Sequence, residues 1–394
     1  MSNRFAERMN HVHESFVREI LKATENPEII SFAGGLPSPD SFPVKEIEKA
    51  ACKVLSEQGA RALQYATTEG DIALRKFIAN RYKTKHGLDI SPDNIIITTG
   101  SQQALDLIGK VFLDEGDSVI IECPGYLGAI QSLAMYMPKF ISVPLNDDGI
   151  DIKELDDVLK TNSPKLFYTV TNFNNPMGTT YTLENKKEIA KRLKGTDTYI
   201  IEDNPYGELR FSGEDVPLMP SVLDDNVILL GSFSKVVAPA MRLGWIYANN
   251  EVIQKLTIAL QASTLHTNSF AQKLVAQYLI DNDLDNHIAK IKEMYSHKRN
   301  LMVRELEKEL PPEVKFTRPE GGMFLWVTLP ENISSRKVFE VAFKNNVIFV
   351  PGDPFYVETG DTNTMRLNYT NSSDEQIVEG VKCLANAIKQ VIEI

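Results

Sequence analysis

The middle of the chain alternates short apolar runs with stretches that have the character of helices. Residues 94–98, NIIIT, form the first apolar run, and a helix is expected to follow at 102–112. Short apolar runs bounded by polar residues are typical of buried strands. Strands that alternate with helices predict a largely parallel sheet between two layers of helices. The other predicted strands are 118–122, 139–143, 165–169, 199–202, 227–230 and 243–247, and the other predicted helices are 127–135 and 184–194.

The two ends of the chain have a different pattern. Residues 5–23 predict an amphipathic helix, and residues 31–43, SFAGGLPSPDSFP, predict an ordered loop. Residues 313–394 predict a separate lobe in which strands are backed by helices. We expect the N-terminal helix to pack with that lobe, because so short a helix is not stable alone. Helices are also predicted at 44–58, 70–86, through most of 251–309, at 335–345 and at 374–391, and strands at 314–317, 323–327, 348–350 and 364–369.

The elements together predict an α/β protein in three parts. Residues 46–290 are expected to form a large domain with a mostly parallel, seven-stranded sheet between helices. Residues 291–394 are expected to form a small α+β domain, and residues 1–45 a helix and loop that pack with it. The sequence contains no internal repeat, low-complexity segment or evident linker.

Composition and charge narrow the class of protein. The 394 residues carry a net charge of −11, with 43% hydrophobic and 24% charged residues, which is ordinary for a globular enzyme. An acidic chain without a basic run argues against a nucleic-acid or anionic-membrane partner. No run of about 18 apolar residues occurs, so no membrane span is predicted.

Cysteine and histidine usage point to a cytoplasmic protein without a metal. The three cysteines, Cys52, Cys123 and Cys383, are scattered and form no C-x-x-C pair, which favours a reducing compartment. The first residues have no apolar signal core. His11 and His13 lie close together, but the other histidines are isolated, and no metal site is predicted.

Lys235 is the most informative residue, in the stretch VILLGSFSKVVAPAMRLGW. It follows a buried strand, and burial would lower the pKa of its amine and make it the nucleophile that a Schiff base requires. Ser232, Ser234 and Arg242 supply hydrogen-bond donors for a phosphate. Pyridoxal 5′-phosphate (PLP) carries both an aldehyde and a phosphate. Taken alone, such a motif is more often a surface lysine in a strand-to-loop turn.

Polar residues follow the other predicted strands in turn. Gly100, Ser101 and Gln102 begin a helix after the first strand, where free N–H groups attract phosphate. Tyr126 could stack on a planar ring, and the proline after Asn175 could orient its amide. Ligands of open α/β sheets bind beyond the carboxyl ends of the strands.

Asp203 ends an apolar strand and needs a partner there. A protonated pyridine nitrogen would serve, and the carboxylate would keep that nitrogen charged. Each of these residues alone is more often a turn or a packing residue. Together, however, five successive strand ends present a phosphate nest, an aromatic, an amide, a carboxylate and a lysine. This combination favours a PLP site.

At these motifs the chain closely resembles the fold-type I, aspartate-aminotransferase-like PLP enzymes over essentially its whole length. The resemblance is carried by TTGSQQALDLIGKVFLDEGD, ECPGYLGA, TNFNNPMGTTY, IEDNPYGELRF, GSFSKVVAPAMRLGW, RPEGGMFLW, FVPGDPF and MRLNYT. SFAGGLPSPDSFP and LQYATTEG are similar to the branch of 2-aminoadipate (LysN-type) and kynurenine aminotransferases. Met177 departs from the N-P-T-G of many relatives, and it changes no assigned role.

The resemblance implies a role for each matching residue at the cofactor. Lys235 would form the Schiff base and move the proton, Asp203 would pair with the ring nitrogen, and Tyr126 would stack on the ring. Asn175 and Tyr206 would donate to the ring oxygen. The phosphate would be held by Gly100, Ser101, Gln102, Ser232, Ser234 and Arg242, and by Tyr65 of a neighbouring subunit, which implies a homodimer.

The resemblance also implies substrate contacts. Arg366 would bind the α-carboxylate in a bidentate fork, beside Asn175 and Gly35 at the entrance. In the LysN-type branch an N-terminal arginine meets a distal carboxylate, and Arg18 in ESFVREILK matches it, with Ser15 on the same segment. Arg18 fits a solvent-facing helix position as well.

The implied activity is transfer of an amino group between an L-amino acid and a 2-oxo acid. The expected acceptor is 2-oxoglutarate, and the donor is 2-aminoadipate, an aromatic or a branched-chain amino acid. A β-eliminating lyase on the same fold would share the cofactor residues. A PLP-sensing transcription regulator would need a DNA-binding extension, and only about 30 residues precede the SFAGG loop.

Overall fold

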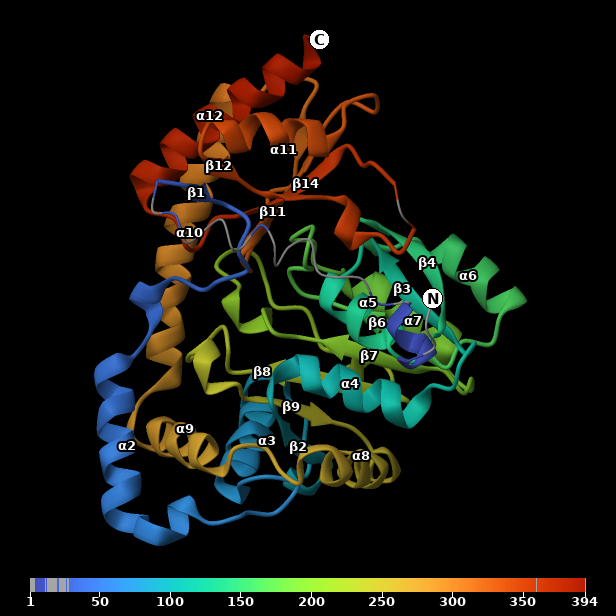
Figure 1. Ribbon diagram of the computed structural model, residues 1–394. Coiled ribbons are helices and arrows are strands. Elements are labelled where there is room, and N and C mark those ends of the chain that lie inside the picture. Colours follow the sequence, from blue (N-terminus) through green and yellow to red (C-terminus); the bar gives the residue numbers. More distant parts are fainter. Residues whose placement is uncertain are drawn as a thin grey trace.

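A central sheet dominates the computed structural model, which describes residues 4–10, 12, 20, 26, 28–358 and 360–393. Its eight strands follow the order β2-β9-β8-β7-β6-β3-β4-β5 (Figure 1). Strands β4, β3, β6, β7 and β8 pair in parallel, whereas β9 runs antiparallel to β8 and β2. The strands are β2 (Ile95–Thr98), β3 (Ser118–Cys123), β4 (Lys139–Asn146), β5 (Gly149–Ile150), β6 (Leu166–Thr169), β7 (Tyr199–Asp203), β8 (Val227–Ser232) and β9 (Gly244–Tyr247).

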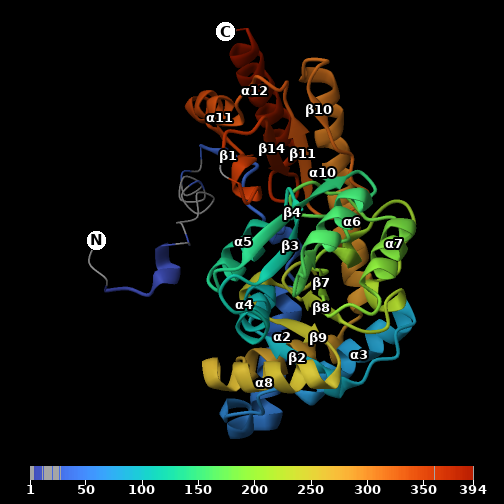
Figure 2. The ribbon, with the colours of Figure 1, turned by 90° about the vertical axis from the view of Figure 1, so that its right-hand side faces the viewer.

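Helices cover both faces of this sheet, because both faces of its strands are apolar. Ile120 and Ile200 belong to one buried cluster, whereas their neighbours Ile121 and Ile201 belong to another, since successive strand residues point to opposite faces. Figure 2 shows α4 and α5 on one side of the sheet and α6 and α7 on the other. The helices of this part are α2 (Val44–Gln58), α3 (Ile72–His86), α4 (Gly100–Phe112), α5 (Leu127–Ala134), α6 (Ile152–Thr161), α7 (Leu183–Leu193), α8 (Asn250–Thr264) and α9 (Ser269–Asp281).

The C-terminal part forms a second, antiparallel sheet of four strands in the order β10-β11-β14-β13. The long helix α10 (Leu284–Glu309) runs from the large sheet to this part, where it packs against α12 (Figure 1). The N-terminal segment joins here too, because β1 (Ile30–Ser31) pairs with β12 (Val347–Ile348). The remaining elements are β10 (Lys315–Phe316), β11 (Phe324–Thr328), α11 (Ser335–Lys344), β13 (Val350–Pro351), β14 (Thr364–Asn368) and α12 (Asp374–Ile392).

The mostly parallel sheet between helices is confirmed, with two differences in detail. The prediction of seven strands was wrong by one, because the two-residue β5 turns back on β4 and is too short to give a pattern. Helix α6 was also missed, although Asp151 caps it. Of the helix predicted at 5–23, the structure describes only a 3₁₀ turn, Glu7–Asn10, and isolated residues.

The division of the chain at residues 45 and 290 stays a prediction. Across the described parts of the chain, no helix is both long enough and apolar enough to span a membrane.

Candidate active site

A cavity of about 480 Å³ opens at the carboxyl ends of the parallel strands. Such a place is where open α/β sheets bind ligands, since successive strands deliver their first loop residues to one edge. The second sheet adds Arg366 from β14, and the loop after β1 adds Gly35. The predicted residues that line the cavity are Gly35, Gly100, Ser101, Gln102, Tyr126, Asn175, Asp203, Tyr206, Ser232, Ser234, Lys235, Arg242 and Arg366.

Lys235 lies three residues beyond β8, with its amine inside the cavity. Its Nζ donates to the carbonyl oxygen of Gly35 at 2.8 Å, which joins the lysine to the loop of residues 31–43. Burial, together with the positive charges of Arg366 and Arg242, lowers the pKa of Lys235 to about 8. A substantial share of the amine is therefore neutral near pH 8, and only the neutral amine is a nucleophile.

Asp203 closes β7 and is 2% exposed. The Tyr168 hydroxyl donates to its Oδ2 at 3.0 Å, whereas its Oδ1 has no hydrogen-bond partner among the described residues. Burial raises the pKa of Asp203 to about 6, and the nearby hydroxyls of Tyr168 and Ser101 partly offset that effect. A buried carboxylate with one free oxygen favours a cationic donor beside it.

Tyr168 was missed by the sequence reasoning, although a signal for it existed. It stands in β6 opposite Ile201 of β7, and Asp203 is two residues further along on the same face. A hydroxyl in the apolar run LFYT needs a partner when it is buried. The adjacent strand's terminal aspartate is the acceptor that this register supplies.

The N-terminus of α4 forms the end of the cavity that suits an anion. Helix α4 begins at Gly100, whose φ of +74° favours glycine, and the first N–H groups of a helix have no partner within it. A Cβ at position 100 would stand 2.9 Å from Nη2 of Arg242, so only glycine allows the guanidinium this close. Ser232 and Ser234 at the end of β8 complete a set of donors that suits a phosphate.

Arg366 is the cation of the second sheet and is 3% exposed. Its Nη1 donates to Asn175 Oδ1 at 2.8 Å and its Nη2 to the Ala33 carbonyl at 2.6 Å. The Phe324 ring lies 4.4 Å from the guanidinium carbon, and Nε has no hydrogen-bond partner among the described residues. Burial lowers the pKa of Arg366 to about 10. The free-energy cost of burying this arginine is offset when an anion binds beside it.

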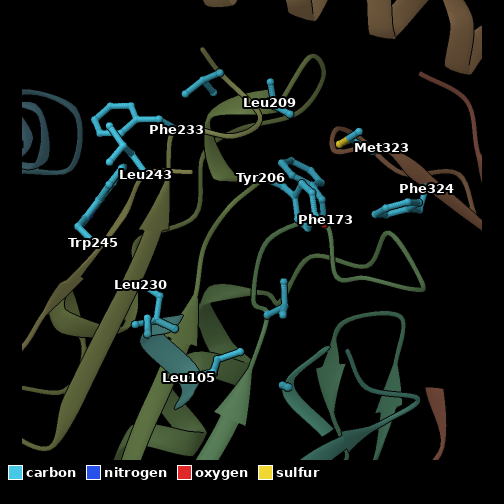
Figure 3. Close-up of a cluster of buried hydrophobic side chains, with 14 of the residues drawn as sticks. Leu105, Phe173, Tyr206, Leu209, Leu230, Phe233, Leu243, Trp245, Met323 and Phe324 are labelled. Carbon is cyan, nitrogen blue, oxygen red and sulfur yellow. The ribbon is translucent and has the colours of Figure 1, made fainter. Parts of the chain in front are cut away.

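Aromatic packing joins the two sheets at this site. Tyr206, from the loop after β7, meets Phe324 of β11 edge to face with the ring centroids 5.9 Å apart. Figure 3 shows Tyr206 and Phe173 facing Met323 and Phe324 across the boundary between the sheets. The position of Arg366 relative to Lys235 and Asp203 therefore depends on buried apolar contacts.

Among the described residues, one predicted site residue, Tyr65, is not brought to the cavity of this chain. Tyr65 follows the 3₁₀ helix Gly59–Leu63, is 79% exposed and lies beside His266, with ring centroids 5.8 Å apart. Ser15 and Arg18 lie outside the described residues.

Comparison with known proteins places the chain among the aminotransferases. Residues 27–384 match the family "Aminotransferase class I and II". The chain is 43% identical to aromatic-amino-acid aminotransferase 1 of Thermococcus litoralis, over 98% of this chain and 94% of that protein. It is 40% identical to 2-aminoadipate transaminase of Thermus thermophilus, over 100% and 98%.

A solved structure that contains a ligand has a similar fold. LysN, α-aminoadipate aminotransferase of Thermus thermophilus, complexed with N-(5′-phosphopyridoxyl)-L-leucine, superposes with a TM-score of 0.91 at 39% identity, covering 99% of this chain and 98% of that one.

The cavity fits pyridoxal phosphate on its own observations. Three buried polar atoms at the cavity, Asp203 Oδ1, Arg366 Nε and Ser101 Oγ, have no hydrogen-bond partner in the described part of the chain. The first suits a protonated ring nitrogen, and the second belongs to a guanidinium that suits a carboxylate. Ser232, Ser234 and Arg242 line the cavity beside the N-terminus of α4, and together they form a set of donors that suits a phosphate.

Replacing Lys235 should change how the stability of the cofactor-free protein depends on pH. The pKa of Lys235 is lowered from 10.5 to about 8, so folding disfavours its proton. The stability that its neutral form gives is present above pH 10.5 and is lost as the pH falls through 8. As the pH falls from 10.5 to 8, the free energy of unfolding of the wild type should decrease relative to that of Lys235→Met. Below pH 8 the two curves of unfolding free energy against pH should run parallel. Urea unfolding of both proteins measures this, and parallel curves throughout would contradict it.

Proposed function

The chain belongs to the class I and II aminotransferases, and from that premise we propose that it transfers amino groups from 2-aminoadipate, aromatic or branched-chain amino acids to 2-oxoglutarate. It is a PLP-dependent aminotransferase. The donor classes are supported by the names of its relatives. A lyase or a transcription regulator is not favoured, because these relatives are named aminotransferases.

The observation that carries the proposal is the meeting of Lys235, Asp203 and Arg366 in one cavity. Bound PLP supplies an aldehyde carbon that accepts the amino group and a ring nitrogen that withdraws electrons. Asp203 would hold the charge of that nitrogen, and Tyr126 would lie on the ring face. Asn175 and Tyr206 would donate to the ring oxygen.

The phosphate would be bound at the α4 end of the cavity. Ser101, Gln102, Ser232, Ser234 and Arg242 stand there beside the free N–H groups of α4, which begins at Gly100. Hydroxyl, guanidinium and backbone N–H donors match the oxygens of a phosphate.

Arg366 and Asn175 would position the substrate. A guanidinium offers two parallel N–H groups to a carboxylate, which fixes the orientation of the Cα that carries the reacting hydrogen. Gly35, Leu36 and Leu127 line the same cavity and give an apolar wall for a substrate side chain. An apolar wall suits leucine and aromatic side chains.

Lys235 would move the proton. With its pKa at about 8, Nζ would take a proton from the substrate Cα as a base and deliver it as an acid at the position of the cofactor carbon C4′ near neutral pH. Burial and the two arginines, rather than a hydrogen-bonded carboxylate, set that pKa, so the amine is not held as a permanent cation.

We also propose a cytoplasmic homodimer in which Tyr65 completes the partner subunit's phosphate site. Tyr65 is exposed and lies outside its own cavity, which suits a contribution to a second chain. The three cysteines are free, which suits a reducing compartment. The β1–β12 pairing supports the division into 1–45, 46–290 and 291–394, with the first part on the small domain.

Labelling should place the cofactor on Lys235. Borohydride treatment of the purified protein should leave a phosphopyridoxyl group on the peptide that contains Lys235, as mass spectrometry of a digest would show. Lys235→Ala should carry no label and lose transamination by several orders of magnitude, because the base and nucleophile are missing. A label on another lysine would refute the assignment.

Substrate choice should separate the two arginines. Arg366→Lys should raise KM for every donor, because a point charge does not replace the two-pronged fork. Arg18→Ala should reduce kcat/KM for glutamate and 2-aminoadipate by one to two decades, which corresponds to the roughly 1.5–3 kcal/mol of a charged hydrogen bond. Leucine and phenylalanine should be almost unaffected. Equal losses for acidic and apolar donors would show that Arg18 is only structural.

Dimerisation should be needed for cofactor affinity. Tyr65→Phe should remain dimeric in sedimentation and bind PLP more weakly, because one donor to the phosphate is lost. A wild type that sediments as a monomer at assay concentration with full activity would overturn the dimer proposal.

A further inference from the structure

Glu122 is a buried carboxylate that the proposed reaction does not use. It lies near the end of β3, is 1% exposed and accepts four hydrogen bonds. Its Oε1 accepts from Thr169 Oγ1 at 2.6 Å, from the Val170 N–H at 3.0 Å and from the Tyr181 hydroxyl at 2.6 Å. Its Oε2 accepts from one donor, Asn174 Nδ2, at 2.7 Å.

A neighbouring glutamate shows how unusual this arrangement is. Glu202, near the end of β7, is fully buried and forms an ion pair with Lys186 at 3.0 Å, so its charge is balanced. Glu122 has no ion-pair partner within the described ranges, and neutral donors alone satisfy it. Burial accordingly raises the pKa of Glu122 to about 7, although its four hydrogen bonds oppose that rise. Burying a carboxyl without an ion-pair partner costs free energy, so we expect its hydrogen bonds to position the groups that donate them.

The hydrogen bond at Oε2 holds a strained loop. Phe173 has a φ of +51°, a left-handed conformation that a bulky residue adopts only when its surroundings enforce it. Asn174 follows it, accepts from the Met177 N–H at its Oδ1 and gives its amide group to Glu122. Both ends of the Asn174 side chain are therefore committed to the shape of this loop.

The same loop carries the partner of Arg366. Asn175 Oδ1 accepts from Arg366 Nη1 at 2.8 Å. Because a guanidinium only donates, this contact identifies the oxygen of the amide and directs the Asn175 NH₂ group elsewhere. A path thus leads from Glu122 to the side chain of Asn174, along the backbone to Asn175, and from the side chain of Asn175 to Arg366.

We propose that Glu122 is a positioning residue that sets the carboxylate affinity of Arg366 by holding the loop of Asn174 and Asn175. The proposal rests on the proposed role of Arg366 as the substrate-carboxylate site. Glu122 does not line the cavity, so its effect is expected on binding, through the loop, and not on the proton transfer at Lys235.

The two carboxylate oxygens of Glu122 accept different numbers of hydrogen bonds, three at Oε1 and one at Oε2, and this difference gives a specific test. In Glu122→Gln the single carbonyl oxygen satisfies the three donors at Oε1, and the new NH₂ group then faces the NH₂ group of Asn174. The loop contact is lost while the other three are kept. In the double variant Glu122→Gln/Asn174→Asp, the glutamine donates to the aspartate, which restores the bond with the same total charge.

The measurement is the dissociation constant of 3-phenylpropionate, an unreactive carboxylate, for the holoenzyme at pH 8 by calorimetry, together with KM, kcat and Tm. We expect Glu122→Gln to weaken the carboxylate and raise KM for all donors about tenfold, as loss of one well-placed hydrogen bond does, with kcat changed less than about threefold. The double variant should return to within about threefold of the wild type.

A control variant separates stability from positioning. Tyr181→Phe removes a bond at Oε1 and leaves the Asn174 contact, so it should lower Tm and leave 3-phenylpropionate binding unchanged. A Glu122→Gln protein that loses Tm but binds 3-phenylpropionate like the wild type would overturn the proposal. Should that variant not fold, Asn174→Ala breaks the same bond, and wild-type affinity there would overturn it equally.

Arg366→Lys distinguishes a failure of the proposed carboxylate site from a failure of the proposed role of Glu122. Unchanged binding in Arg366→Lys would reject the proposed carboxylate site itself. Weak binding in Arg366→Lys with unchanged binding in Glu122→Gln would reject only the role of Glu122.

Discussion

The cost of burying ionisable groups with incomplete partners shapes this site. Lys235, Asp203 and Arg366 lie in one cavity, and burial shifts the pKa of each in the direction that favours its neutral form. The pKa is about 8 for Lys235, about 6 for Asp203 and about 10 for Arg366. A fold stabilises such groups only through what surrounds them. Here the surroundings leave Asp203 Oδ1 and Arg366 Nε free, so the balance of charge is completed by a ligand that brings both a cation and an anion.

The rest of the structure holds these groups at fixed separations. The parallel strands deliver Asp203 and Lys235 to one edge, and aromatic packing between Tyr206 and Phe324 sets the second sheet against that edge. The loop of residues 31–43 is bonded to both cations, since Lys235 donates to the Gly35 carbonyl and Arg366 to the Ala33 carbonyl. A movement of either Lys235 or Arg366 therefore affects the same loop.

Much of the fold and of the site could be predicted because their signals are local. Apolar runs located the long strands, and the residue after each run located the cavity lining, since strand ends meet at one edge. Tyr168 and Glu122 could not be found in that way. Their partners come from the register of adjacent strands and from a loop with a left-handed Phe173, which a single sequence does not display. The two-residue β5 was missed because its pairing depends on the turn after β4.

The central claim is that the half-partnered carboxylate of Asp203 holds the positive charge of the ring nitrogen. The most direct measurement is the ¹⁵N chemical shift of ring-labelled PLP bound to the wild type and to Asp203→Asn, at a pH above the pKa of about 6 of Asp203. The account predicts a protonated nitrogen in the wild type and an unprotonated one in the variant, because an amide carries no charge to stabilise the proton. The same shift in both proteins would contradict it.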